Sequence, residues 1–399
     1  MTSDTKFLQP INPTSNPNPN SVSNSTELLT YNYSQNPSSV SVQIVADVLV
    51  KGGLARAIAE FQATAGVDPA FSEILSETIV ELEGGVSEGQ SQIKSKVVGV
   101  FEVEAQQTFS FGFSSSLELR AKEIDNPDIE YSKAKSEGAF LVLDLSNLNR
   151  PKIVDYFAFD SQLISSKKIG NVRAKVGRNF TIVDRDRNID IDGNNGIDFV
   201  TGAAIGTYQN QFRNNTQIAV VEVNASNVQA FGDYLIDNLG TDVTYGTIWN
   251  DNLNGTSNAD KIYASLGNDR VSGMRGDDII EGGGGNDRLE GGDGNDKIHG
   301  GDDNDLITDG LGDDVMYGGE GADRFVFKKN QSLRPGEFNI VADFRVGVDR
   351  VTLRGWGKGK IADLFTDTPD GAIFTAKKGG QVLFEDVDKG AIISSFDLA

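Results

Sequence analysis

The feature that most constrains this chain is a run of aspartates spaced nine residues apart in its last third. A fixed short period indicates a stacked architecture, in which each repeat buries its apolar side against its neighbours. The sequence therefore predicts a regular coil over this stretch. The aspartates are Asp260, Asp269, Asp278, Asp287, Asp296, Asp305, Asp314 and Asp323.

Each nine-residue copy has the same internal order. The central copies read GGGGNDRLE (282–290), GGDGNDKIH (291–299) and GGDDNDLIT (300–308), with glycine first, aspartate sixth and an apolar residue eighth. Glycine accepts the left-handed backbone angles of a tight turn, and the lone apolar residue of a short strand can face inward. The eighth-position residues are Ile262, Val271, Ile280, Leu289, Ile298, Ile307, Met316 and Phe325.

Two copies per turn of the coil would arrange the aspartates in two columns. One column would hold Asp260, Asp278, Asp296 and Asp314, and the other Asp269, Asp287, Asp305 and Asp323. Without a cation such columns repel, and the core between them is thin. Calcium takes six to eight oxygen ligands, which carboxylates and turn carbonyls can supply. The three gaps in each column would accept about six calcium ions.

The charge distribution agrees with cation binding. The stretch Asp251–Asp323 contains 18 acidic residues and supplies more than half of the net charge of −22. About six calcium ions would carry about +12, which is comparable to that local excess. The same charge disfavours nucleic acid as a partner. An acidic linker that stays in solvent is the alternative, but it explains neither the fixed period nor the inward apolar position.

Residues 251–326 resemble the RTX calcium-binding β-roll, whose nonapeptide is G-G-x-G-x-D-x-U-x. The resemblance implies that the eight aspartates are calcium ligands and that carbonyls from glycine turns complete each site. Asn258 and Asp303 replace the fourth-position glycine, and both residue types tolerate left-handed angles. Ala264–Ser265 and Gly273–Met274 depart from the pattern, so the first turn should bind metal least well. The glycines implied are Gly276, Gly283, Gly285, Gly292, Gly294, Gly301, Gly319 and Gly321.

The end of the chain resembles the segments that follow such rolls in exported proteins. Phe325–Phe327 and Asp343–Leu353 resemble a β cap, which an open coil end needs to avoid aggregation. Ile392–Ile393 and Phe396–Ala399 resemble the uncleaved C-terminal signal of type I secretion. The first thirty residues have no cationic start and no apolar core, so no N-terminal signal peptide is expected, and no transmembrane helix is expected either. The resemblance implies export by type I machinery to an extracellular location.

The expected fold class is mainly β, with an N-terminal β-sandwich-like domain and short helices, then a parallel β-roll and a β cap. Apolar residues at helical spacing over Val42–Gln62 and over Phe71–Leu82, the latter capped by Asp68–Pro69, predict two amphipathic helices. Short alternating runs from Val98 onward predict strands. The expected division is 1–38 disordered Asn/Pro/Ser tail, 39–90 helical segment, 91–240 β-sandwich-like domain, 241–326 β-roll, and 327–399 cap and secretion signal.

A second calcium site is an open hypothesis in the segment Asn188–Gly193. Asp190 and Asp192 stand at alternate positions before a glycine, and such carboxylates around a turn can bind calcium. A metal-free acidic β-turn is the alternative.

This sequence lacks the catalytic residues that most of the enzyme classes found with such rolls require. The chain has one histidine, His299, so a zinc protease motif is absent. Gly85–Gly89 matches G-x-S-x-G, but no histidine upstream of the roll could act as the base. His299 itself is expected to lie in solvent.

The favoured function is a secreted calcium-binding protein whose non-catalytic β-domain interacts with a cell-surface glycan or protein. The alternative is a secreted polysaccharide-acting hydrolase or lyase that uses carboxylates of the β-domain.

Overall fold

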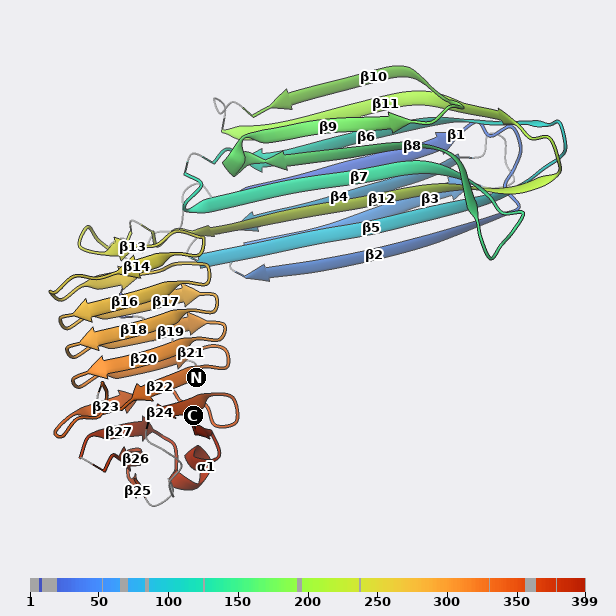
Figure 1. The fold of residues 1–399 in the computed structure, drawn as a ribbon. Coiled ribbons are helices and arrows are strands. Elements are labelled where there is room, and N and C mark those ends of the chain that lie inside the picture. Colours follow the sequence, from blue (N-terminus) through green and yellow to red (C-terminus); the bar gives the residue numbers. More distant parts are fainter. Residues whose placement is uncertain are drawn as a thin grey trace. The chain divides into compact units, whose positions relative to one another are not determined.

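The computed structural model describes residues 7–8, 20–51, 53–64, 71–82, 86–124, 126–191, 196–236, 238–329, 331–355, 364–377 and 379–398. The chain forms two units. One is Ser15–Gly232, and the other combines Met1–Thr14 with Asp233–Ala399. Almost every element in Figure 1 is a strand, so the predicted fold class is confirmed. Among the described residues, no helix is long and apolar enough to cross a membrane.

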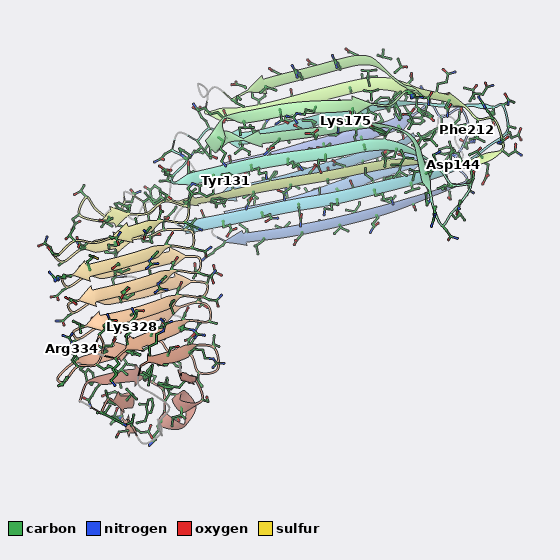
Figure 2. All side chains as sticks on the ribbon, viewed as in Figure 1. Tyr131, Asp144, Lys175, Phe212, Lys328 and Arg334 are labelled. Atoms are coloured by element: carbon green, nitrogen blue, oxygen red, sulfur yellow. The ribbon has the colours of Figure 1, made fainter. Side chains whose placement is uncertain are left out.

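The unit Ser15–Gly232 is a sandwich of two six-stranded sheets. Its strands are long, and side chains project from both of their faces (Figure 2). In spatial order the first sheet contains β10 (Phe180–Asp190), β11 (Ile197–Gln211), β6 (Thr108–Lys122), β1 (Ser21–Tyr31), β4 (Phe71–Leu82) and β3 (Gly53–Thr64). The second contains β2 (Ser39–Lys51), β5 (Val86–Val103), β12 (Thr216–Asp233), β7 (Glu130–Asp144), β8 (Lys152–Ile164) and β9 (Ile169–Val176). The short 3-10 helix Ser165–Lys167 follows β8.

The interior between these sheets is aromatic in one part and polar in another. Phe109, Phe111 and Phe113 of β6 are buried against Phe157 and Tyr208. Elsewhere the facing strands bury hydroxyl, amide and carboxyl groups that bond across the sandwich. The Thr26 and Ser136 hydroxyls lie 2.7 Å apart, and Glu222 accepts hydrogen bonds from the hydroxyls of Thr30 and Ser72.

Both predicted helices are wrong, and the polar interior explains the second of them. The stretches Val42–Gln62 and Phe71–Leu82 form β2, β3 and β4 instead. On β4 the inward positions alternate strictly, but they include Ser76 and Thr78 as well as Ile74 and Val80. The apolar residues alone therefore imitate a helical spacing and hide the period of two. Asp68 and Pro69, the predicted cap, lie outside the described residues.

The predicted disordered tail is also wrong where the structure describes it. Residues 21–31 form β1, whose inward side chains include Asn24, Thr26 and Thr30. A polar composition normally indicates disorder because little apolar surface is buried. Here hydrogen bonds across the sandwich satisfy the polar groups. The other residues of the predicted tail lie outside the described part, except Phe7–Leu8, Asn20 and 32–38.

The main body of the second unit is a coil of two parallel sheets. The first sheet runs β13 (Thr244–Tyr245), β15 (Lys261–Tyr263), β17 (Ile279–Gly284), β19 (Lys297–Asp302), β21 (Val315–Gly319), β23 (Phe338–Val341) and β27 (Gln381–Glu385), followed by β26 (Gly371–Thr375) and β25 (Phe365–Thr368). The other runs β14 (Asn252–Asn254), β16 (Arg270–Arg275), β18 (Arg288–Asp293), β20 (Leu306–Leu311), β22 (Arg324–Lys328), β24 (Arg350–Arg354) and β28 (Phe396–Leu398). Helix α1 (Lys389–Ile393) precedes β28.

The last strands continue the two sheets beyond the repeats. β24 pairs in parallel with β22, and β28 pairs in parallel with β24. Phe396 packs against Phe365, Phe374 and Phe384, so the end of the coil is closed by aromatic side chains. An unpaired apolar coil end would favour aggregation, and this cluster covers it.

Candidate metal centre

The register of the coil stacks equivalent positions of alternate copies. Ile262 of β15 pairs with Ile280 of β17, and Ile280 pairs with Ile298 of β19. Each step is 18 residues, which confirms that two copies make one turn. The eight eighth-position residues all face inward, with at most 1% of each exposed. The apolar core of the roll is therefore one side chain wide on each sheet.

The aspartates form the two predicted columns. In each column one carboxylate oxygen, Oδ1, accepts a hydrogen bond from the backbone N–H of the aspartate one turn earlier. The N···O distances are 2.7 Å from Asp260 to Asp278 and 2.9 Å from Asp278 to Asp296. In the other column they are 2.8 Å from Asp269 to Asp287 and from Asp287 to Asp305. The ladder fixes the direction of every carboxylate and leaves its second oxygen to face elsewhere.

That second oxygen, Oδ2, has no hydrogen-bond partner in most of the columns. It is buried and unpartnered in Asp269, Asp278, Asp287, Asp296, Asp305 and Asp314. A buried carboxylate oxygen without a partner costs substantial free energy, and native proteins rarely leave one unsatisfied. Six of them in register indicate that the roll is built around a group that the polypeptide does not supply.

The first-position glycines show where that group would lie. A Cβ atom added to Gly282 would stand 2.4 Å from Asp287 Oδ2 and 2.4 Å from the Gly300 carbonyl oxygen. A Cβ on Gly300 would stand 2.3 Å from Asp305 Oδ2 and 2.5 Å from the Gly318 carbonyl oxygen. At Asp278, Asp287, Asp296 and Asp305 the free carboxylate oxygen thus shares a small space with a backbone carbonyl from the next turn. Calcium–oxygen distances are about 2.3–2.6 Å, so the space and its oxygens fit this ion.

Burial strongly disfavours the charged form of these carboxylates. It raises the pKa of Asp287 to about 8 and that of Asp305 to about 9, against the lowering effect of the backbone hydrogen bond that each accepts. Burial likewise raises the pKa to about 7 at Asp269, Asp296, Asp314 and Asp323. A cation beside the free oxygens would favour the charged form again, so metal binding would release protons near neutral pH.

The turns adopt the backbone conformation that the sequence predicted. All eight glycines proposed to lend carbonyls have positive φ, from 92° at Gly319 to 144° at Gly294. Asp303 has a φ of 72°, whereas Asn258 is not among the described residues with positive φ. Ser265 and Met274 also adopt left-handed angles, with φ of 79° and 77°. The irregular first copies therefore keep the turn geometry despite their side chains.

The donor set is made of oxygen only. No group of three or more acidic or histidine side chains converges on one point within the described residues. A bound ion would therefore draw on one or two aspartates and several backbone carbonyls, which is the mixture that calcium accepts. Thiolate and imidazole ligands, which zinc and copper prefer, do not line these spaces.

Sequence reasoning missed the residues that extend the columns. Asp251 N donates to Asp269 Oδ1, and Asp323 N donates to Asp349 Oδ1 at 3.0 Å. In the other column Asp314 N donates to Asn339 Oδ1. Asp251 follows the nine-residue spacing and could have been found from it. Asn339 and Asp349 could not, because longer loops of the cap separate them from the repeat.

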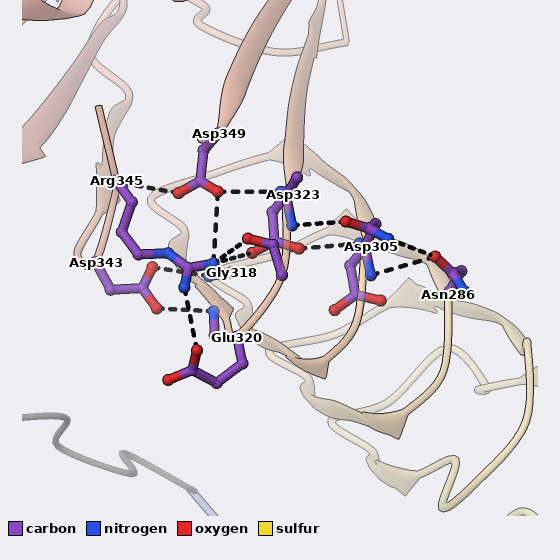
Figure 3. Close-up of polar contacts among 12 residues, drawn as sticks. Asn286, Asp305, Gly318, Glu320, Asp323, Asp343, Arg345 and Asp349 are labelled. Atoms are coloured by element: carbon purple, nitrogen blue, oxygen red, sulfur yellow. Dashed lines mark hydrogen bonds and ion pairs between the residues drawn. The ribbon is translucent and has the colours of Figure 1, made fainter. Parts of the chain in front are cut away.

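Two further cap residues lie at the end of the second column (Figure 3). The carboxylate of Asp343 accepts hydrogen bonds from the backbone N–H groups of Gly318 and Gly319, at 2.8 and 2.9 Å. The guanidinium of Arg345 lies 3.5 Å from Asp323 Oδ2 and 3.7 Å from Asp349 Oδ1. Nothing in the local sequence identified either residue.

The prediction that His299 lies in solvent is wrong. His299 is 7% exposed, and its ring lies 6.1 Å from the ring of Tyr317 on the neighbouring strand. Phe7 packs edge-on against Tyr317, and Leu8 N donates to the carboxylate of Glu281 at 2.6 Å. Residues far away in the sequence therefore cover this outer face of the roll.

The hypothesis of another calcium site at Asp190 and Asp192 stays a prediction. Asp190 ends β10, and Asp192 lies outside the described residues. Asp198 is buried and accepts a hydrogen bond from the Ser165 hydroxyl.

A match to a known repeat family agrees with this geometry. Residues 245–280, 264–298, 272–307 and 290–325 match the RTX calcium-binding nonapeptide repeat. No curated protein matches the chain. Among solved structures, the AlgE6R3 subunit of the mannuronan C5-epimerase of Azotobacter vinelandii is 21% identical, with 40% of this chain and 80% of that chain covered and a TM-score of 0.17.

The extracellular lipase LipA of Serratia marcescens is 17% identical, with 40% of each chain covered and a TM-score of 0.20. The chain spans less than half of that lipase. The family match and the register of the strands together identify residues 245–325 as RTX calcium-binding nonapeptide repeats folded as a β-roll.

Proposed function

We propose that this protein is exported from the cell and folds its roll on extracellular calcium, and that Ser15–Gly232 is a non-catalytic interaction domain. The observation that carries the calcium part is the row of buried, unpartnered Oδ2 atoms beside turn carbonyls. Calcium would neutralise the columns and complete their oxygen contacts. The chain itself supplies the aspartates, directed by the N–H ladder, and the carbonyls of the positive-φ turns.

The aspartates and the glycines would have different roles in calcium binding. Six of the eight repeat aspartates would bind through Oδ2, because their Oδ1 is already used by the ladder and their Oδ2 has no partner. The Oδ2 atoms of Asp260 and Asp323 instead face Thr256 and Arg345. The eight glycines would keep adjacent turns close enough for their carbonyls to reach the ion; a Cβ on Gly301 would stand only 2.0 Å from the Gly283 carbonyl oxygen. Larger side chains at these positions would separate the turns.

The weak affinity expected of such sites is consistent with folding after export. Extracellular calcium modules bind at about 10⁻⁴–10⁻³ M, so the sites would be empty in a cytosol and filled outside. Because the ion binds the folded roll, filling the sites drives folding after export. The segment Ile392–Ala399 is proposed as the signal for type I machinery.

Isothermal titration of the full chain tests the calcium part. Calcium should bind with a stoichiometry of several ions per chain, and magnesium at the same concentration should not replace it, because magnesium requires a smaller octahedral site. Absence of calcium binding at millimolar concentration would contradict the proposal. Deleting the last eight residues should stop export, and unchanged export would exclude the signal. Because this deletion also removes β28 and the Phe396 contacts of the cap, Phe396→Ala in the full-length chain is the control for loss of the cap.

The interaction role of the β-domain is supported by its edge strand β2. β2 pairs only with β5 among the described strands, and six of its large apolar residues are exposed. Natural edge strands are protected by charges, bulges or short length. The edge strand β10 has both alternating charges and a register shift after Ile182, and β9 is shorter. β2 has thirteen residues and a single lysine, at its end.

We propose that β2 pairs antiparallel with β2 of a second copy. A register centred on Val45 opposes Val42 to Val48 and Gln43 to Asp47, and no like charges face each other. Sedimentation velocity should then show a dimer, and Val48→Lys should return it to monomer. The matched variant Val183→Lys changes an exposed valine on β10 and should leave the dimer intact. A monomeric wild-type chain would contradict the pairing.

One observation supports the alternative, a polysaccharide-acting enzyme. A groove of about 710 Å³ on the second sheet contains Glu137 and Asp160, which are directly opposed on β7 and β8. Retaining glycosidases use two carboxyls about 5–5.5 Å apart. Glu137 is paired with Lys135 and its side chain is 52% exposed, which is unlike a buried acid catalyst. If the groove is catalytic, Glu137→Gln and Asp160→Asn should abolish glycan cleavage; if no glycan is cleaved, the alternative fails.

A further inference from the structure

We infer that the guanidinium of Arg345 is a built-in cation that takes the place of a calcium ion at the end of the second aspartate column. This inference rests on the proposed calcium binding. It concerns the position next to Asp323, the last aspartate of that column, where the repeat ends and the cap begins.

The oxygens at this position resemble those around the free sites. Asp323 and Asp349 are each 1% exposed and are linked by the same N–H to Oδ1 hydrogen bond that joins the repeat aspartates. A glycine-turn carbonyl, that of Gly321, also faces the position. Two buried carboxylates and a turn carbonyl would leave a strongly negative pocket if no cation entered it.

Arg345 fills that pocket (Figure 3). Its Nη2 lies 3.5 Å from Asp323 Oδ2 and 3.7 Å from Asp349 Oδ1, and it donates a hydrogen bond to the Gly321 carbonyl. Its Nη1 lies 3.3 Å from Glu320 Oε2. The Arg345 backbone N–H donates to Asp349 Oδ2 at 2.7 Å, which holds the residue in place.

The role of Arg345 is identified by comparing Asp323 with the aspartate one turn earlier in the same column. Asp305 Oδ2, one turn earlier in the same column, has no partner, and neither do the corresponding atoms of Asp287 and Asp269. Asp323 Oδ2 is satisfied, and the group that satisfies it is a permanent cation on the chain. Arg345 of the cap thus supplies a positive charge at the last turn of this column.

Within the described residues, the other column ends at a neutral amide. There Asn339 takes the position of the next aspartate: its Oδ1 accepts from Asp314 N, and its Nδ2 donates to Asp309 Oδ2 at 3.0 Å. A neutral amide lowers the negative charge at that end, so no guanidinium is needed. The negative charge at the column end is therefore balanced by a guanidinium in one column and reduced by a neutral amide in the other.

The test is the number of calcium ions bound by full-length variants, measured by equilibrium dialysis and metal analysis. Arg345→Ala should bind one more calcium ion per chain than the wild type, because removal of the guanidinium opens an oxygen-lined site. Arg345→Lys keeps the charge and should bind the wild-type number. Arg288→Ala removes an exposed arginine of the same roll and should also bind the wild-type number.

The outcomes separate this inference from the proposed function. If the wild type binds no calcium, the proposed function itself fails. If the wild type binds several ions and Arg345→Ala, with native β circular dichroism, binds no more, only the role of Arg345 is overturned. An Arg345→Ala chain whose roll does not fold at millimolar calcium overturns it as well, because calcium then cannot replace the guanidinium.

Discussion

The sandwich and the roll differ in how many acidic groups they bury side by side. The sandwich buries single carboxyls such as Glu222, whose Oε1 accepts hydrogen bonds from two hydroxyls and whose Oε2 has no partner. The roll buries its aspartates in two columns around a core that is one side chain wide, and leaves their second oxygens without partners. The sandwich can therefore be stable without an ion. The roll combines little apolar burial with much buried charge, and its stability should depend on a cation.

Substitution of a column aspartate should have the largest effect on this contrast. Asp305→Asn removes one charge and one ligand oxygen, so the calcium-dependent part of the free energy of unfolding of the roll should fall by about 3 kcal/mol. Without calcium the sign should reverse, because burial raises the pKa of Asp305 to about 9 and the neutral amide relieves that cost. Chemical denaturation with and without calcium measures both values.

The control for that substitution is Asp293→Asn, an exposed aspartate of the same roll that lies 3.5 Å from Arg275. Its effect should stay within about 0.5 kcal/mol under both conditions. Equal losses of unfolding free energy for Asp305→Asn and Asp293→Asn would show that burial in the column does not determine the effect.

Glu222→Gln should affect the sandwich and leave the roll unchanged. Burial raises the pKa of Glu222 to about 7, from an ordinary value near 4.5. The stability linked to this group is complete below pH 4.5 and is lost as the pH rises through 7, because the folded state holds the proton longer. At pH 8 the glutamine variant should be more stable by up to about 3 kcal/mol.

Thermal unfolding of the sandwich between pH 4 and pH 8 measures this difference. The variant should lose the part of the pH dependence that lies between these values. Glu104→Gln, on an exposed residue, should keep the wild-type profile. An unchanged profile for Glu222→Gln would mean that the carboxyl is solvated.

The smallest predicted effect concerns turn strain in the first copies of the roll. Met274 has a φ of 77° and is 52% exposed, so its side chain contributes little packing to offset the strain. Met274→Gly should stabilise the calcium-bound roll by about 0.5–1 kcal/mol, because glycine adopts such angles freely. Met274→Ala keeps the strain and should give no gain in a denaturation experiment.

The sequence predicts the roll well because its period is imposed by the fold. One turn of the coil is 18 residues, so aspartates, glycines and inward apolar residues such as Ile280 and Ile298 must all return at fixed positions. The cap breaks that period. Asp349 follows Asp323 by 26 residues, so neither it nor Arg345 could be assigned to the column from spacing.

The sandwich was predicted as a β domain only from residue 91 onward, and its earlier strands were missed for a different reason. Its inward positions include Ser76, Thr78 and Glu222, whose polarity is compensated across the interior by partners that are distant in sequence. Hydrophobic periodicity cannot detect a strand whose buried face is partly polar. Only pairing in three dimensions reveals why Asn24 and Thr26 lie inside.

Hydrogen exchange of the full chain, followed by mass spectrometry with calcium and with a chelator, tests the central claim most directly. In calcium, backbone amides of the roll strands β16–β22 and of the sandwich strands β5, β6 and β12 should all be protected. Chelation should remove protection from the roll peptides and leave that of the sandwich peptides unchanged. Roll peptides that stay equally protected in chelator would contradict the account.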